Sequence, residues 1–287
     1  MAPLPPKALI LGCGYIGRAL GRALARQGVD VTGWVRTVGS SEDLADEGIT
    51  PWIGDVADTS DWDGIADGFD AVIHCASSAR GGAAIYRSVY LDGVRQALSH
   101  CPAARFLFVS STSVYGQEDG SAVTEASPAE PKTETGQILR EAEEEALREA
   151  NALVFRVGGI YGPGRGILFE RFRQGEAVIE GDGTRSINQA HRDDVVSALL
   201  CGLGVGIPPL PDGIYNVCDD EPVSYLTYYG WLAERLGKPM PPFVPPNPNR
   251  KRGWTNKRVS NAKLKAAGWK PRFPTFREGL DEALRAL

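Results

Sequence analysis

The sequence predicts an α/β fold in which helices cover both faces of a parallel sheet and a smaller lobe follows. Short apolar runs alternate with segments of helical periodicity from residue 7 to residue 157, as strands and helices do around a parallel sheet. Apolar residues make up 43% of the 287 residues, enough for a large buried core. After about residue 160 the chain changes to Gly-Pro turns and short segments. We therefore expect a Rossmann doubly wound parallel sheet in residues 1–162 and a smaller C-terminal substrate lobe in residues 163–287, with the chain free to cross back to the sheet.

The elements of the first part follow one another in a regular order. Residues 7–11 predict a buried strand, and apolar residues recur at helical spacing in residues 15–27, with Gly28 ending that helix. Further strands are expected at residues 29–35, 49–53, 71–75, 105–110 and 153–157, the second of these five being short and interrupted by Pro51. Helices are expected at residues 85–100 and 134–150.

The second part is less regular. Helical spacing returns in residues 195–202 and 225–236, and a proline-rich loop follows at residues 239–248. No repeat or low-complexity tail is visible. This region is expected to form the smaller lobe.

Charge argues against a nucleic-acid partner. The formal net charge is −5, whereas a nucleic-acid surface needs a concentrated basic face. One short basic cluster exists, residues 250–252 (Arg-Lys-Arg) with Lys257 and Arg258. It is either a solvated surface patch or an anion site for a substrate phosphate.

The five cysteines are scattered and include no CxxC pair, which indicates reduced thiols and a cytoplasmic protein. The three histidines lie far apart in sequence, so no metal site is expected. The apolar run at residues 8–11 is too short for a signal peptide. Glycines and prolines interrupt residues 195–210, so no membrane span is expected there.

A loop with the sequence GCGYIG stands between the first predicted strand and the first predicted helix. The GxGxxG spacing alone is a weak signal, but this strand–loop–helix context makes it specific for a dinucleotide. Gly12 permits the tight turn, Gly14 lets the backbone approach a pyrophosphate, and Gly17 lets the helix pack closely on the strand. Tyr15 and Ile16 lie where the helix N-terminus directs its N–H groups at the phosphates. The loop predicts an NAD(P)-binding site.

The end of the second strand bears on the choice between NAD and NADP. An NAD site favours a carboxylate there, to bind the ribose 2′-hydroxyl. Asp30 is acidic but stands at the start of that strand, whereas Arg36 follows its end. A guanidinium suits a 2′-phosphate. The sequence therefore favours NADP, with NAD as the alternative cofactor if Arg36 is only a solvated loop residue.

Several later segments carry motifs of one enzyme family. They are residues 54–56 (GDV), 72–76 (VIHCA), 110–116 (SSTSVYG), Arg156 with residues 159–164 (GIYGPG), 191–194 (HRDD), 215–217 (YNV) and 268–271 (GWKP). Together they resemble the extended branch of the short-chain dehydrogenase/reductase superfamily, the NAD-dependent epimerase/dehydratase group, over nearly the whole chain. The resemblance implies that the loop of Asp55 and Val56 meets the adenine, and that Cys75, Ala76 and Ser110 lie along the cofactor. It places residues 215–217 in the C-terminal lobe.

The resemblance also implies a catalytic set. The family uses a Ser or Thr together with a Tyr and a Lys spaced YxxxK on one helix, where the Lys lowers the pKa of the Tyr. Here Ser111 keeps the first position, but Thr135 and Leu139 stand in place of the Tyr and the Lys. Glu143 matches the acidic residue four places on, which supports this register. The chain is therefore expected to be an atypical member that lacks the YxxxK pair.

Another group must then supply the proton. Tyr90 falls where the family has a further polar residue, usually Asn, and is the first candidate; its alternative role is packing. Ser111 would orient the substrate oxygen. Tyr161 is expected to cap the cofactor pocket, His191 to cap a helix and tie the two lobes, and Lys132 to be solvated.

These observations favour an NAD(P)-dependent oxidoreductase or epimerase-like enzyme that acts on a small carbonyl or sugar-like substrate. The alternative is a non-catalytic NADP-binding redox sensor or interaction protein. Nucleotide-sugar relatives often hold the diphosphate with an arginine shortly before the HRDD position, and Arg185 is near but not at the expected place. Helices at residues 85–100 and 134–150 form a homodimer's four-helix bundle in many relatives. The second is strongly acidic here, which leaves a homodimer open.

Overall fold

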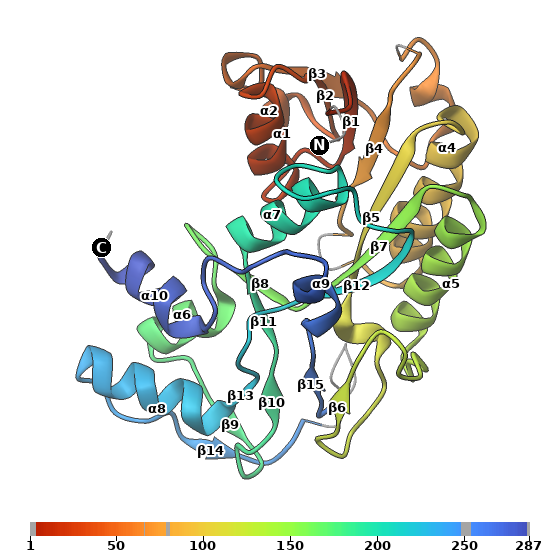
Figure 1. Ribbon diagram of the computed structural model, residues 1–287. Helices are drawn as coiled ribbons and strands as arrows, with labels where there is room; N and C mark the ends of the chain where they lie inside the picture. Colours follow the sequence, from red (N-terminus) through yellow and green to blue (C-terminus); the bar gives the residue numbers. More distant parts are fainter. Residues whose placement is uncertain (1–3, 66, 79–80, 248–253, 286–287) are drawn as a thin grey trace.

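The structure is a computed structural model that describes residues 4–65, 67–78, 81–247 and 254–285. Its centre is a seven-stranded parallel sheet with the strand order β12-β7-β5-β4-β1-β2-β3 (Figure 1). The strands are β1 (Lys7–Leu11), β2 (Asp30–Val35), β3 (Ile49–Ile53), β4 (Ala71–His74), β5 (Arg105–Ser111), β7 (Ala152–Val157) and β12 (Gly213–Val217). The order reverses between β1 and β4, as in a doubly wound Rossmann sheet. The predicted fold class is confirmed.

Helices cover both faces of the sheet (Figure 1). α1 (Gly17–Ala25) and α7 (Arg192–Gly202) pack on one face, and α4 (Gly93–His100) and α5 (Glu134–Arg148) pack on the other. Along β1, Ile10 joins the first core, whereas Leu9 and Leu11 join the second. Because both faces are buried, the strand has an uninterrupted apolar sequence.

The smaller lobe lies beyond the carboxyl ends of the strands. It contains α6 (Ile167–Gln174), α8 (Tyr225–Leu236), α10 (Phe276–Arg285) and two short two-stranded sheets, β9 (Ile179–Glu180) with β14 (Phe243–Val244) and β10 (Ser186–Ile187) with β13 (Val223–Ser224) (Figure 1). Its core is largely aromatic, and the rings of Phe172 and Tyr229 stack with their centroids 5.8 Å apart.

Between the lobe segments the chain crosses back to the sheet. α7 packs beside α1, and β12 pairs in parallel with β7, Gly213 lying opposite Leu153. Residues 215–217, which the family resemblance placed in the C-terminal lobe, therefore belong to the seventh strand of the sheet. The physical reason is their burial, because Tyr215, Asn216 and Val217 are all buried. The remaining elements are two short strand pairs and one helix. The pairs are β8 (Gly159–Tyr161) with β11 (Gln189–His191) and β6 (Ala122–Val123) with β15 (Arg258–Val259), and the helix is α9 (Ala262–Ala266).

Several boundaries differ from the sequence prediction for local reasons. α1 begins at Gly17 rather than residue 15, because the preceding residues form the glycine turn, in which Gly14 N–H donates to Gly12 O. The helix predicted at residues 85–100 begins earlier as α3 (Ala83–Tyr86) and continues through a π-helical turn, Arg87–Asp92, into α4. The short helix α2 (Val38–Ser41) was not predicted.

Pro51 lies on β3, an edge strand that pairs only with β2. An edge strand tolerates proline, because the missing N–H can face away from the ladder. The interruption in the third predicted strand therefore marks the sheet edge.

Within the described residues, no helix combines the length and the apolar character that crossing a membrane requires. The same residues hold no group of three or more His, Cys, Asp or Glu side chains that could bind a metal ion.

Candidate functional site

The glycine loop lies at the carboxyl end of β1, beside the point where the strand order reverses. Gly12 has a φ of +86°, and a Cβ built there would lie 2.3 Å from Ala76 Cα. A Cβ on Gly17 would lie 2.4 Å from Gly12 O. Both positions therefore exclude a side chain, Gly12 because the loop after β4 crosses it and Gly17 because α1 packs tightly on the turn.

Gly14 is different, because a Cβ built on it would meet no atom within 4 Å. The space above this backbone is open, although the residue stands inside a crowded turn. α1 begins three residues later and has no side-chain cap at its N-terminus. Uncapped N–H groups at a helix N-terminus, next to an open glycine, form the setting in which proteins bind phosphate groups. These residues fit a dinucleotide pyrophosphate.

Tyr15 connects the glycine loop to the segment after β8. Its hydroxyl donates to Pro163 O at 3.1 Å. The guanidinium carbons of Arg165 and Arg192 lie 5.0 and 5.4 Å from the centre of its ring. Ile16 is buried in the core beside α1. In this loop, the side chain of Ile16 therefore anchors α1, and the side chain of Tyr15 reaches the start of the lobe.

The loop after β3 is held by acidic side chains. Asp55 N–H donates to the carboxylate of Asp61 at 2.6 Å, and the carboxylate of Asp55 accepts from Ala57 N–H at 3.0 Å. Val56 is buried in the same core as α4. The carboxylate of Asp55 thus has an internal partner in addition to any ligand.

The loop after β4 lies against the glycine turn. Cys75 N–H donates to Leu11 O at 2.7 Å, and Ala76 is the residue that a side chain on Gly12 would strike. Burial raises the pKa of the Cys13 thiol to about 12 and also raises the pKa of the Cys75 thiol. Both thiols are therefore neutral, so they pack rather than react.

Arg36 is exposed and directly follows β2. It forms no ion pair with any residue that the structure describes. Arg18, on the first turn of α1, is already held by two 2.8 Å hydrogen bonds to the carboxylate of Glu47. Asp30 is at the other end of β2. Of these charged side chains, Arg36 is the one at the carboxyl end of β2 without an ion-pair partner among the described residues.

The catalytic candidates lie on α5 and on two elements that pack against it, β5 and the π-helical turn. Ser111 ends β5, and its hydroxyl accepts from Ser113 N–H at 3.2 Å. Thr135 is half-buried in the first turn of α5, one turn before Leu139, which is 3% exposed in the apolar core. Tyr90 is half-buried in the π-helical turn, its ring centroid 5.0 Å from that of Tyr86.

His74 supports the turn that carries Tyr90. Its Nε2 lies 3.0 Å from Val89 O, and the ring is fully buried. Burial lowers the pKa of His74 to about 4, so the imidazole is neutral and Nε2 donates to the carbonyl. The ring also lies edge-on to Phe108, at a centroid distance of 5.4 Å. A π-helical turn shifts the backbone bonding pattern, and His74 binds one of its carbonyl groups.

Ser110, expected along the cofactor, donates its hydroxyl to Glu143 at 2.5 Å. Glu143 also accepts three hydrogen bonds from Arg156, at 2.7, 3.0 and 3.2 Å. The guanidinium of Arg156 lies 4.8 Å from the ring centre of Tyr115, whose hydroxyl donates to Asn216 at 2.8 Å. These buried groups form a polar network beneath the sheet end, and the Ser110 hydroxyl belongs to it.

His191 accepts from Asp193 N–H through Nδ1 at 3.2 Å and so caps α7. Its ring centroid lies 3.9 Å from that of Phe273 and 5.3 Å from that of Tyr161. Burial raises the pKa of Tyr161, which makes its phenol a poor acid at neutral pH. His191 caps a helix and joins the sheet to the lobe.

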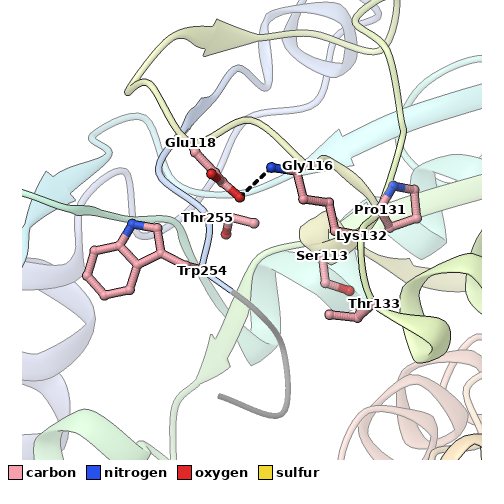
Figure 2. Close-up of a pocket in the computed structure, with 8 residues that line it drawn as sticks. All are labelled: Ser113, Gly116, Glu118, Pro131, Lys132, Thr133, Trp254 and Thr255. Atoms are coloured by element: carbon pink, nitrogen blue, oxygen red, sulfur yellow. Dashed lines mark hydrogen bonds and ion pairs between the residues drawn. The ribbon is translucent and has the colours of Figure 1, made fainter. Parts of the chain in front are cut away.

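A cavity of about 270 Å³ lies between the segment after β5, the N-terminus of α5 and the segment before β15 (Figure 2). Its walls include Ser113, Gly116, Pro131, Thr133, Trp254 and Thr255. Lys132 and Glu118 also line it and form an ion pair at 2.8 Å (Figure 2). Lys132 is exposed, as expected from the sequence, but it has a carboxylate partner.

Lys257 belongs to the basic cluster that the sequence predicts to be either a solvated surface patch or an anion site. It is only 5% exposed, so it is not part of a solvated patch. Its ammonium donates to Tyr115 O at 2.8 Å and to Thr255 Oγ1 at 3.1 Å. Burial, together with the charge of Arg185, lowers the pKa of Lys257 to about 8. Residues 250–252 of that cluster lie outside the described residues.

Comparisons with known proteins agree with this geometry. The profile of the NAD dependent epimerase/dehydratase family matches residues 8–218. Protein YeeZ of Escherichia coli K12 is 31% identical over 246 residues, which cover 83% of this chain and 86% of that protein. A conserved protein of unknown function from Silicibacter pomeroyi DSS is 30% identical, with 98% of both chains covered and a TM-score of 0.79. UDP-glucuronic acid 4-epimerase from Bacillus cereus, in complex with NAD, is 20% identical with 96% of both chains covered and a TM-score of 0.77.

Proposed function

The chain belongs to the NAD dependent epimerase/dehydratase family, and from that premise we propose that it is an NADP(H)-dependent oxidoreductase with a non-standard proton donor. Its substrate would be a small carbonyl or sugar-like compound. One observation carries the proposal: the space above Gly14 is open and lies next to the uncapped N-terminus of α1. Ser111 is the last residue of β5 in the same sheet. The family supports a nicotinamide cofactor, and the named Bacillus cereus relative binds NAD.

The cofactor would be held by the loop of Gly12, Gly14 and Gly17, with the backbone of Tyr15 and Ile16 facing its phosphates. Arg36 would favour NADP by binding the 2′-phosphate, and NAD is the alternative if it does not. Further contacts would come from the loops after β3, β4 and β5, listed here as Asp55, Val56, Cys75, Ala76 and Ser110. Since the Ser110 hydroxyl is bound by Glu143, that residue would contribute its backbone. When bound, the cofactor supplies hydride chemistry.

The chain's own part is to orient the substrate and to move a proton. Ser111, at the end of β5, would orient the substrate oxygen by donating a hydrogen bond to it. Tyr90 would supply the phenolic proton from the π-helical turn. Thr135 could only orient, because an aliphatic hydroxyl has no accessible pKa, and Leu139 supplies no charge. Losing one acid–base group costs about 10²–10⁴-fold in rate, so slow turnover is expected.

The test is to incubate the full chain with NADPH and a panel of aldehydes and ketones and to follow the absorbance of the reduced cofactor. Consumption of NADPH that depends on one carbonyl compound supports the proposal. Tight NADPH binding without consumption for any compound would contradict it.

A second candidate function is a non-catalytic NADP-binding sensor or interaction protein. The observation that favours it is Leu139, which is buried in the core where the family has its catalytic lysine. This function predicts NADPH binding with no turnover, together with a change in protease sensitivity or oligomeric state between the oxidised and the reduced cofactor.

We also propose how the chain assembles and where it is located. A homodimer through α4 and α5 is the assembly implied by the family resemblance. Two ion pairs already lie within one chain beside these helices, Arg87 with Glu141 at 3.0 Å and Arg95 with Glu145 at 3.7 Å. Light scattering would decide between monomer and dimer. The unpaired cysteines of the described residues suit a reducing cytoplasm.

A further inference from the structure

Two threonines on the wall of the 270 Å³ cavity already use a lone pair of their hydroxyl oxygens inside the protein. Thr255 Oγ1 accepts from the Lys257 ammonium at 3.1 Å. Thr133 Oγ1 accepts from Gly136 N–H at 3.2 Å, as the N-cap of α5. A hydroxyl that accepts in this way keeps its own proton to donate. The cavity therefore has two hydroxyl donors, and hydrogen bonds from Lys257 and from Gly136 N–H hold their oxygen atoms in place.

Positive charge stands behind both donors. Lys257 is 5% exposed and forms no ion pair with any carboxylate in the described part of the chain. The charged side chain that faces it is another cation, Arg185. Thr133 stands at the N-terminus of α5, a helix of 15 residues whose dipole is positive at that end. Glu118 is the one carboxylate among the described residues that line the cavity, and it is paired with Lys132 at 2.8 Å.

A buried ammonium without a counter-ion is unfavourable, because the interior does not replace its lost hydration. The lowered pKa of Lys257 reflects that penalty. An anion in the adjacent cavity would offset it. Among the described residues, two hydroxyl donors and one ammonium without a counter-ion suit an anion with two oxygens and a single charge, which describes a carboxylate better than a phosphate dianion.

We propose that this cavity, which Ser113 lines two residues after Ser111, holds the carboxylate end of a carbonyl substrate, bound by the hydroxyls of Thr133 and Thr255 with Lys257 behind them. The inference rests on the proposed oxidoreductase function and names the substrate class for it. Lys257 acts through Thr255 and is a positioning residue. Tyr90 and Ser111 keep the roles proposed above.

The experiment uses a matched pair of aldehydes that differ only in charge, 4-carboxybenzaldehyde and 4-formylbenzamide. Calorimetry on the full chain with bound NADP⁺ measures the dissociation constant of each. We expect the carboxylate to bind at least about tenfold more tightly, as for one charge-assisted hydrogen bond. Equal affinity of the two aldehydes for the wild-type chain would overturn the inference.

Variants locate the selectivity. Lys257→Met should abolish the preference for the carboxylate, and Thr255→Val should reduce it while leaving the buried lysine in place. Thr255→Ser keeps the hydroxyl and should restore it. The double variant Lys132→Ala with Glu118→Gln is the matched control, because it removes this ion pair from the cavity wall without changing the net charge there. A preference that survives both Lys257→Met and Thr255→Val would contradict the proposed site.

The pH dependence gives a readout that does not depend on turnover. A bound anion favours the charged ammonium, so carboxylate affinity should fall as pH rises through about 8, the pKa of Lys257. The affinity of the carboxamide should stay level. Selective binding without NADPH consumption would contradict the proposed function while upholding the carboxylate site, so the two failures are distinguishable.

Discussion

Arg156 on β7 and Glu143 on α5 form a fully buried ion pair, with Arg156 Nη2 2.7 Å from Glu143 Oε2 and side-chain exposures of 2% and 0%. Arg140 approaches the same carboxylate at 3.4 Å from one turn earlier on α5. The pair joins the sheet to the helix that would carry the missing YxxxK motif.

Arg156→Met should destabilise the fold by about 3–5 kcal/mol, because it leaves a buried carboxylate without its main partner. Urea unfolding followed by circular dichroism measures the free energy. The double variant Glu143→Leu with Arg156→Met should recover much of the loss, since no charge is left buried. A single-variant loss below about 1 kcal/mol would mean that Arg140 and Ser110 alone can stabilise the carboxylate.

Gly14→Ala should leave the fold intact and weaken dinucleotide binding, because its Cβ meets nothing in the protein but enters the space above the loop. Gly17→Val should both lower the Tm and abolish binding, because its side chain would strike Gly12 O and Ile10. Calorimetry with NADPH and thermal unfolding report the two effects. Gly230→Ala on α8, which also meets nothing within 4 Å, is the control. Wild-type NADPH affinity in folded Gly14→Ala would refute the loop assignment.

Arg36→Ala should weaken NADPH about ten- to a hundredfold and leave NADH nearly unchanged, as expected for one charge-assisted contact to the 2′-phosphate. Competition binding with both cofactors measures the ratio. Arg26→Ala, which removes an exposed arginine at the far end of α1, should change neither. If both cofactors weaken equally, or the wild-type chain prefers NADH, the NADP assignment is wrong.

Stability should fall on mild acidification because of His74. Its pKa is about 4 in the folded protein and about 6.5 in the unfolded chain, so below pH 6.5 the unfolded chain binds the extra proton. The stabilisation is complete above 6.5 and is lost as pH falls towards 4. Between about pH 7 and about pH 5.5 the loss should be about 1 kcal/mol.

The control for that prediction is His74→Gln, which keeps a donor for Val89 O but does not titrate. His191, whose pKa burial also lowers, contributes with the same sign and remains in the variant. Chemical denaturation at both pH values should therefore show a smaller acid loss in His74→Gln. An identical loss in both proteins would remove His74 as its cause.

Tyr90→Phe should reduce turnover far more than Thr135→Ala, once the carbonyl panel has identified a substrate. The first change removes the phenolic proton but keeps the ring packed against Tyr86. The second removes a hydroxyl that cannot act as an acid at pH 7. Turnover of both variants under one condition decides between them. A large loss for Thr135→Ala with none for Tyr90→Phe would mean that Thr135 orients the substrate and the proton comes from elsewhere.

The fold could be predicted because its signals are local. β1 and α1 have their periodicity in adjacent residues, and the glycine loop stands between them. The sequence predictions fail where a partner that is distant in the sequence determines the local structure. The π-helical turn before α4 binds His74 of β4, and residues 215–217 form a strand because β7 offers an open edge. Neither partner can be inferred from the local periodicity.

The residues of the candidate site also differ in whether local sequence or a distant partner determines their environment. The glycine loop and Arg36 could be named from the sequence, because strand ends and a short motif specify them. The burial of Lys257 could not, because its carbonyl acceptor, Tyr115, is 142 residues away. A lysine inside a charged run also resembles a solvated surface residue. The partner of the Ser110 hydroxyl, Glu143, is likewise 33 residues distant on another element.

The hydrogen bond from Tyr15 to Pro163 makes one residue of the dinucleotide loop part of the lobe's first turn. If binding of the dinucleotide and binding of a ligand in the lobe both change the free energy of this hydrogen bond, the two binding events are thermodynamically coupled, and the coupling is reciprocal. If a ligand in the lobe moves Pro163 and changes dinucleotide affinity by some factor, the dinucleotide must change the affinity of that ligand by the same factor. In that case the single phenol of Tyr15 would couple occupancy of the dinucleotide loop to occupancy of the lobe.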